Sequence, residues 1–461
     1  MSLRTFSFIF ILIGLISTVA LMFTNCGEFE ANQNASKISI DSNKFEDFEN
    51  NPEHVLDEEL KVIIEKNKLT RLSDPQLEDR DLVQLGKLLF SDPGMSNLRD
   101  VSCSTCHQNP LGSGDGLPLP IGSGGVGTFP NRKQINGQSK PMRRHSPAIF
   151  NKAREGMNHA LWDGRLQFIL GYPSSPVDEI SGEKPDRPDI TENFENAFDI
   201  QPLFPLITPE EFFGFNNDLS QLPNTPAIWD EILKTRVLIH EHYQIAFSKA
   251  YPKVELEKLN PGHFSRAIRA FLKLNFRAND TPFDSYLSGD FTALTLSQKR
   301  GMKVFYGAGK CNACHTGARL TNDGFFSVGV PHLGFEPFQD DHGREDATGD
   351  RKDRYKIKTP GLRNVKLSGP YMHNGAFKSL EQVIDHKNDI KANIQNYSIP
   401  DGYQDHYEVT LMVDRDPERN QERIDQVIPI MRNGLNLTQD QKSDLLEFLE
   451  NGLLDTSFFF R

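Results

Sequence analysis

Two copies of one short cysteine motif limit what this chain can fold into more than any other feature. Residues 103–107 read CSTCH and residues 311–315 read CNACH, so both copies follow the pattern Cys-x-x-Cys-His. Two thiols at this spacing can bond to the vinyl groups of one haem, and the histidine that follows can bind its iron. Structural zinc sites place their second cysteine pair about 15–20 residues away, much closer than the second copy here. The sequence therefore predicts two covalently bound c-type haems, attached through Cys103, Cys106, Cys311 and Cys314, with His107 and His315 on the irons.

The stretches before the two motifs are also alike, which indicates an internal duplication. Leucines recur at helical spacing over residues 82–89, and a second helix is expected to begin near Ser297. Strand signals are sparse, so we expect a mostly α fold: two c-type cytochrome-like haem domains with long irregular loops. Further helices are predicted over 228–250, 263–276 and 438–454. The predicted domains are an N-terminal haem domain over 76–290, with a surface insertion over 171–200, and a C-terminal haem domain over 291–461.

The start of the chain predicts export and attachment to a membrane. Arg4 precedes an almost continuous apolar stretch over residues 6–23, which is the pattern of a secretory signal peptide. Cys26 follows closely and favours bacterial lipoprotein processing, in which this cysteine is lipidated; the alternative is an uncleaved helical anchor. We therefore predict a signal peptide over 1–25, a polar tether over 26–75 and a periplasmic protein held at a membrane.

The formal net charge of −12 bears on the partners of the protein. Nucleic-acid binding requires concentrated lysine and arginine, so this charge argues against a nucleic-acid partner. The same charge is compatible with docking of a basic redox protein by charge complementarity.

A glycine-rich stretch over residues 122–127 fits the pattern Gly-x-Gly-x-x-Gly of dinucleotide-binding sites. No strand is predicted before it and no helix after it, so the structural context of such a site is missing. We interpret the stretch as a flexible loop near the first haem.

Four further motifs resemble the bacterial di-haem cytochrome c peroxidases and their relative that matures methylamine dehydrogenase. The motifs are Leu85–Phe90, Trp162–Arg165, Thr359–Val365 and Pro370–Gly375. The resemblance implies that the N-terminal haem binds hydrogen peroxide at an open iron position. It also implies that the C-terminal haem receives electrons from a small cytochrome c or cupredoxin. The expected function is the reduction of hydrogen peroxide to water, and a homodimer is compatible with this resemblance.

The resemblance also implies roles for individual residues. Trp162 matches the family tryptophan that lies between the haems. Glu211 matches the glutamate that moves a proton during peroxide cleavage, and Gln201 matches the glutamine that positions it. Glu179 is the competing candidate for the acid-base group because it is closer to Trp162 in the sequence.

The first haem site departs from the family pattern. Many members place a distal histidine on this haem, whereas residues 108–144 contain no histidine. We therefore expect an iron that is permanently open and needs no reductive activation, with Met142 or His145 as the substitutes that would close it. His145 also stands where the family has an asparagine that helps to bind calcium. Imidazole is a poor calcium ligand, but backbone carbonyls near Ser368 and Pro370 remain, so calcium stays an open expectation.

The second haem site departs in the sixth ligand of its iron, which in the family is usually methionine or tyrosine. Counted from Gly375, that position falls on Lys387, and His386 and Met372 are the alternatives. The identity of this ligand decides how strongly the haem holds an electron.

Two other functions are compatible with the same motifs. A MauG-like di-haem oxidase would act on a protein or an organic substrate instead of reducing peroxide with a donor protein. A non-enzymatic di-haem electron carrier would have six ligands on both irons. Gln201, Glu211 and the missing distal histidine argue against the carrier.

Overall fold

The computed structural model describes residues 51–135, 137–154, 156–169, 172–174, 187–191 and 194–460. The predicted signal peptide, the lipidated Cys26 and the competing Glu179 lie outside these residues. Its α-helices are α3 (Pro52–Asn67), α4 (Arg80–Ser91), α5 (Cys103–Cys106), α6 (Pro188–Thr191), α7 (Ala197–Ile200), α8 (Thr225–Ile232), α9 (Glu241–Ala250), α10 (Pro261–Asn275), α11 (Pro282–Leu287), α12 (Leu296–Tyr306), α13 (Glu345–Thr348), α14 (Leu380–Asn388), α15 (Ile390–Asn396), α16 (Pro417–Asp425) and α17 (Gln439–Glu447).

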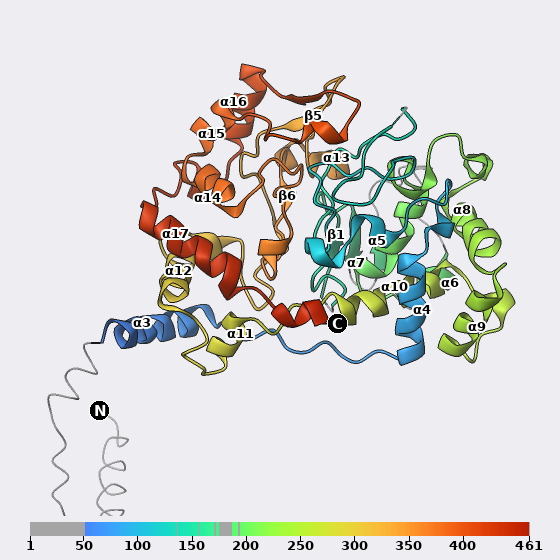
Figure 1. Cartoon of the computed structure of the whole chain (residues 1–461), viewed down its shortest axis with the longest axis horizontal. Helices are drawn as coiled ribbons and strands as arrows, with labels where there is room; N and C mark the ends of the chain where they lie inside the picture. Colours follow the sequence, from blue (N-terminus) through green and yellow to red (C-terminus); the bar gives the residue numbers. More distant parts are fainter. Residues whose placement is uncertain are drawn as a thin grey trace, which may run out of the picture. The chain divides into compact units, whose positions relative to one another are not determined.

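The strands of the described residues are few and short. Antiparallel pairing joins β1–β2–β3, β4–β6 and β5–β7 into three small sheets. Helices and long irregular connections make up the rest (Figure 1). The prediction of a mostly α fold is confirmed. The strands are β1 (His159–Ala160), β2 (Leu166–Ile169), β3 (Tyr172–Ser174), β4 (Phe325–Phe326), β5 (Leu333–Phe335), β6 (Ile357–Lys358) and β7 (Leu411–Val413).

One hydrophobic core is built mainly from residues 82–278, which we call the N-terminal half, and Phe458 near the end of the chain joins it. Helix α4 begins as the sequence indicates, because the Asp79 carboxylate accepts hydrogen bonds from the first free N–H groups of the helix. Its leucines at 82, 85 and 89 face α10 and α9, whereas Leu88 is exposed. Helix α10 packs against α4.

A second core is built mainly from residues 283–453, the C-terminal half. Here α12 packs against α17, and Thr295 rather than Ser297 caps α12 through a capping box with Gln298. Helix α3 also joins this core through Leu56 and Leu60, although the sequence placed residues 52–67 in a polar tether. Two leucines on one face of an otherwise polar helix are enough to dock it on α12.

The two halves repeat one helix crossing. A Cβ atom on Gly86 of α4 would lie 1.9 Å from the carbonyl oxygen of Ala267 on α10. A Cβ atom on Gly301 of α12 would lie 2.0 Å from the carbonyl oxygen of Asp444 on α17. In each half the helix that precedes the cysteine motif therefore crosses a later helix at a distance that only glycine allows.

Two other sequence expectations differ from the structure. The helix predicted over 228–250 is divided, because a wider turn over Leu233–Val237 and a bend near His240 separate α8 from α9. The end of the expected surface insertion is buried, since Phe194, Ala197 and Phe198 belong to the core of the N-terminal half. Within the described part of the chain, every helix is too short or too polar to span a lipid bilayer.

Candidate functional site

The first cysteine motif forms a short helix whose end presents His107. Ser102 and Thr105 cap this turn reciprocally, so Cys103 and Cys106 stand one turn apart. The His107 ring lies with Nδ1 2.8 Å from the carbonyl oxygen of Ser113. Nδ1 therefore carries the proton in this hydrogen bond, and Nε2 is left with a free lone pair. Burial lowers the pKa of His107 to about 4, which keeps the imidazole neutral as a metal ligand must be.

The second motif repeats this arrangement with different neighbours. The His315 Nδ1 lies 3.1 Å from the carbonyl oxygens of both Leu320 and Pro360. Burial lowers the pKa of His315 to about 4 as well. Both motifs thus offer two unpaired thiols and one imidazole nitrogen whose orientation is fixed by the opposite nitrogen, which is how haem-binding and metal-binding histidines are held. The residues present fit a c-type haem at each motif.

Glu211 lies beside the first motif. It is half-buried on the short turn Pro209–Phe213, and burial is the main cause that raises the pKa of its carboxyl to about 7. Burial and the Glu211 charge together raise the pKa of Cys103 to about 12. The Glu211 charge also contributes to the raised pKa of Cys106. A carboxyl that titrates near neutrality therefore faces the place where the haem would be attached, as a proton-transfer group requires.

The glycine-rich loop holds the Glu211 segment in place. The Ser123 amide donates a hydrogen bond of 2.8 Å to the carbonyl oxygen of Glu211, and a Cβ atom on Gly122 would lie 2.1 Å from the carbonyl oxygen of Glu210. Residues 121–125 are buried, so the expectation of a flexible loop is not met. Gly122 therefore allows the backbone of this loop to pack closely on the backbone of the Glu211 segment.

Gln201 is half-buried on the turn that follows α7, in the same half as Glu211. Among the contacts of the described residues, none joins its side chain to Glu211. Burial raises the pKa of Glu211, and the charge of Arg165 opposes that rise more than any other charge near it.

Trp162 lies where the two halves meet. Its indole Nε1 donates a hydrogen bond of 2.7 Å to the carbonyl oxygen of His145, and its own carbonyl oxygen accepts one of 2.8 Å from the amide of Lys358. It lines an open cavity with walls from both halves, whose empty space of about 930 Å³ includes the solvent at its mouth.

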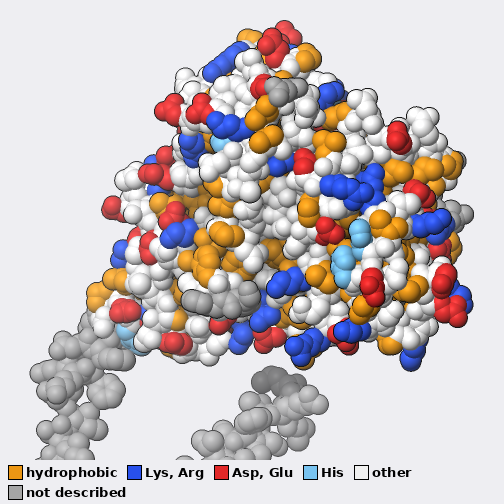
Figure 2. All heavy atoms as spheres, turned by 45° about the vertical axis from the view of Figure 1, so that its right-hand side comes forward, with side chains coloured by type: hydrophobic (Ala, Val, Ile, Leu, Met, Phe, Trp, Pro, Cys, Tyr) orange, Lys and Arg blue, Asp and Glu red, His pale blue; other side chains and the backbone are white. Residues whose placement is uncertain are grey.

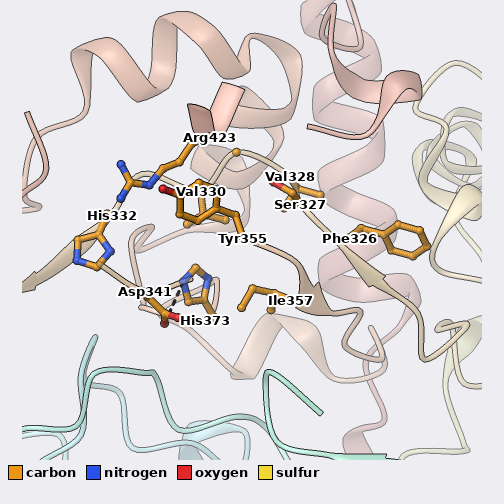
Figure 3. Close-up of a pocket in the computed structure, with 11 residues that line it drawn as sticks. Phe326, Ser327, Val328, Val330, His332, Asp341, Tyr355, Ile357, His373 and Arg423 are labelled. Atoms are coloured by element: carbon orange, nitrogen blue, oxygen red, sulfur yellow. Dashed lines mark ion pairs between the residues drawn. The ribbon is translucent and has the colours of Figure 1, made fainter. Parts of the chain in front are cut away.

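Buried charges join the halves next to this tryptophan. The Arg144 guanidinium contacts Asp163 at 2.5 Å. It also donates hydrogen bonds to both carboxylate oxygens of Asp341, at 2.6 and 2.7 Å. The His373 Nε2 atom lies 3.8 Å from a carboxylate oxygen of Asp341, and both residues line a small pocket together with His332 and Arg423 (Figure 3).

The side chain of His145 offers no oxygen ligand to a calcium ion. Its ring is buried, and its Nδ1 lies 2.9 Å from the carbonyl oxygen of Leu117. In the described residues, no group of three or more His, Cys, Asp or Glu side chains is placed to hold a metal ion. Backbone carbonyl oxygens can also bind calcium, so the calcium site stays a prediction.

The three candidate sixth ligands of the second haem lie in different surroundings. The charge of Lys387 contributes to lowering the pKa values of Cys311, Cys314 and His315, so Lys387 lies near the second motif. His386 is fully buried elsewhere: its Nε2 lies 3.0 Å from the carbonyl oxygen of Val328, and its ring packs on Phe377. Met372 lines the cavity between the halves.

Three residues of this region were not found from the sequence. Arg144, Asp341 and Lys152 come together only in the folded chain, and a single arginine, aspartate or lysine carries no sequence signal. In the folded chain the Nζ atom of Lys152 lies 6.0 Å from the centre of the Trp162 ring.

Comparison with known proteins agrees with this geometry. Residues 80–292 match the family model of the di-haem cytochrome c peroxidases. A methylamine utilization protein MauG of Methylorubrum extorquens is 28% identical over 66% of this chain and 67% of its own length. A cytochrome c551 peroxidase of Pseudomonas aeruginosa is 29% identical over 65% of this chain and 70% of its own length.

Solved structures share the fold. A MauG-like protein associated with microbial copper homeostasis aligns with a TM-score of 0.58 at 24% identity, over 84% of this chain and 95% of its own. The diheme peroxidase BthA of Burkholderia thailandensis aligns with a TM-score of 0.54 at 19% identity, over 82% of this chain and 87% of its own. Together with the duplicated motif and the residues around it, these matches confirm the resemblance of the chain to the di-haem cytochrome c peroxidases and to the MauG proteins.

Proposed function

We propose that this chain is a di-haem c-type peroxidase that reduces hydrogen peroxide to water with electrons from a small donor protein. The observation that carries the proposal is the position of Glu211, a half-buried carboxyl with a pKa of about 7 beside the thiols of the first motif. An electron carrier has no need of such a group. The reaction consumes one peroxide, two electrons and two protons and yields two molecules of water.

Two haems would be held covalently through Cys103 and Cys106 and through Cys311 and Cys314, with His107 and His315 as axial ligands. When bound, the iron porphyrins supply the electrons that cleave the O–O bond. The chain itself supplies the proton movement. The Glu211 carboxylate would accept a proton from one peroxide oxygen and return it to the other, which leaves as water. Gln201 is proposed as its positioning partner.

Electrons would enter at the C-terminal half and cross to the N-terminal half near Trp162, whose side chain and main chain bond to both halves. Relatives named cytochrome c551 peroxidase support a small cytochrome as the donor, and a cupredoxin is the other class. On the face in Figure 2, acidic and basic side chains are interspersed and form no large patch of one sign. Docking on that face would therefore rely on shape more than on charge. Export through residues 1–25 and lipidation at Cys26 would place the reaction in the periplasm.

Lys387 is the proposed sixth ligand of the second iron. It is half-buried on α14 near Cys311, Cys314 and His315, and no hydrogen bond or ion pair to its ammonium group occurs among the described residues. Burial lowers the pKa of Lys387 to about 8, which makes the neutral amine accessible near physiological pH. An amine with a free lone pair can bind iron, whereas an ammonium ion cannot.

Replacing Lys387 by methionine is expected to raise the reduction potential of the second haem, because methionine as an axial ligand favours the reduced iron. The paramagnetic-resonance signal of that haem in the oxidised protein should change as well. Met372→Leu, which conserves volume, is the control and should leave both readouts unchanged. If Met372→Leu alters the signal and Lys387→Met does not, the assignment of Lys387 is wrong.

The proposed function is tested with purified holoprotein, hydrogen peroxide and a reduced small cytochrome c, with a small-molecule reductant as a second electron source. We expect peroxide-dependent oxidation of two donor molecules per peroxide and none when peroxide is omitted. Peroxide that reacts with the haems but oxidises neither donor would favour oxidation of a protein or organic substrate. Haems that do not react with peroxide would favour an electron carrier.

A further inference from the structure

Among the described residues, the wall of the cavity between the halves contains one cation with neither a hydrogen-bond nor an ion-pair partner. Lys152 lines it from the N-terminal half, with its Nζ atom 6.0 Å from the centre of the Trp162 ring. Among the described residues, no hydrogen bond or ion pair reaches this Nζ atom. The side chain is half-buried because it borders the cavity, while protein surrounds it on the other sides.

The other charges of the cavity wall are already paired. Asp323 is the one acidic residue that lines the cavity among those described, and it contacts Lys358 and, at 2.6 Å, Arg319. Arg363 is paired with Asp284 outside the cavity. One carboxylate thus faces two cations, and Lys152 adds a further positive charge.

An enclosed cation without a counter-charge is unfavourable. Burial is the first cause that lowers the pKa of Lys152 to about 7, and the charge of Lys358 is the second. A negatively charged group in the cavity would remove both the isolation of the ammonium ion and the excess of positive charge.

The position of the cavity indicates where such a group would come from. The Lys152 charge contributes to lowering the pKa of His107, and Pro360, which lines the cavity, accepts the hydrogen bond of His315. The cavity thus lies between the two expected axial histidines. A haem carries two carboxylate side chains at the edge of its ring, so a haem at either motif could reach the cavity with an anion.

We infer that Lys152 binds a carboxylate of one of the two haems and thereby raises the reduction potential of that haem. The inference rests on the proposed function, because it requires haem at the motifs. A positive charge near an iron favours its reduced form, which carries one positive charge less. Lys152 would act as a positioning and tuning residue, not as a group that touches peroxide.

The test uses the holoprotein and its variants Lys152→Met, Lys152→Arg and Lys391→Met. Lys391 is an exposed lysine of α15 and serves as the charge control. Haem content is measured for each variant, and the reduction potential of each haem is followed by optical titration. We expect Lys152→Met to keep two haems and to lower the potential of one haem by at least about 59 mV, a tenfold change in its reduction equilibrium. Lys152→Arg and Lys391→Met should retain the wild-type potentials.

Two results would overturn the inference. The first is two bound haems with unchanged potentials in Lys152→Met. The second is a wild-type potential that varies with added phosphate while that of Lys152→Met does not, because Lys152 would then bind a free anion from solution. Wild-type protein that holds fewer than two haems would instead refute the proposed function, so the two failures can be told apart.

Discussion

Replacing Glu211 by glutamine is expected to lower the rate of peroxide reduction by about 10²–10⁴-fold, the range for loss of a positioned acid-base group. Glutamine keeps the size and the polarity of the side chain but cannot carry the proton between the two oxygens. Haem content should stay at its wild-type value, because Glu211 is not part of either attachment motif. Steady-state peroxide turnover and the haem spectrum together measure both quantities.

Glu210 offers a matched control one residue away. Its charge contributes to the raised pKa of Glu211, whereas Glu211 is the glutamate whose charge raises the pKa of both thiols of the first motif. Glu210→Gln should therefore change turnover by no more than a few-fold. The wild-type rate should rise as the pH increases through about 7, since Glu211 must be ionised to accept a proton, and this rise should be missing in Glu211→Gln. Equal losses in the two variants would refute the role of Glu211.

Replacing Arg144 by methionine is expected to lower the free energy of unfolding by about 3–5 kcal/mol, the cost of removing one partner of a buried ion pair. Asp163 and Asp341 would each keep a buried charge without this partner. Although burial alone would raise it, the pKa of the Asp341 carboxyl is held well below its usual range, mainly by Arg144. The contribution of this pair is therefore present above the usual aspartate pKa of about 3.9 and is lost as the pH falls through the lower pKa of the folded state.

Urea unfolding at neutral pH measures this effect, and the adjacent arginine provides the control. Arg143 is about half exposed and pairs with Asp346 at 2.7 Å. Exposed pairs contribute about 0–1 kcal/mol, so Arg143→Met should have little effect on the midpoint. If Arg143→Met loses as much stability as Arg144→Met, the buried ion pairs of Arg144 do not stabilise the protein more than an exposed pair does.

The parts that the sequence predicted well are those in which chemistry fixes local spacing. The attachment of a haem requires two thiols and a histidine within five residues, so the motifs at Cys103 and Cys311 could be recognised without a structure. The helix before the first motif was also predicted, because its leucines recur at helical spacing, and the structure adds that Asp79 caps it. The resemblance pointed to Glu211, and the fold brings that residue close to Cys103.

The parts that the sequence could not predict depend on contacts between distant segments. Arg144 and Asp341 are far apart in the chain, and only the docking of the halves brings them together. The packing of helix α3 on the core was not predicted, because its buried face has only two leucines within a polar sequence. The loop at Gly122 was taken as flexible because glycine permits many backbone conformations, whereas here it permits close packing on Glu210.

The bonds of Trp162 also have a consequence for the speed of the proposed reaction. A hydrogen bond at its indole and another at its carbonyl oxygen tie it to segments from opposite halves of the molecule. These two bonds are expected to hold the tryptophan in one orientation relative to both halves. Electrons that cross the molecule here would then meet the same tunnelling distance at every turnover, without a preceding movement of the ring.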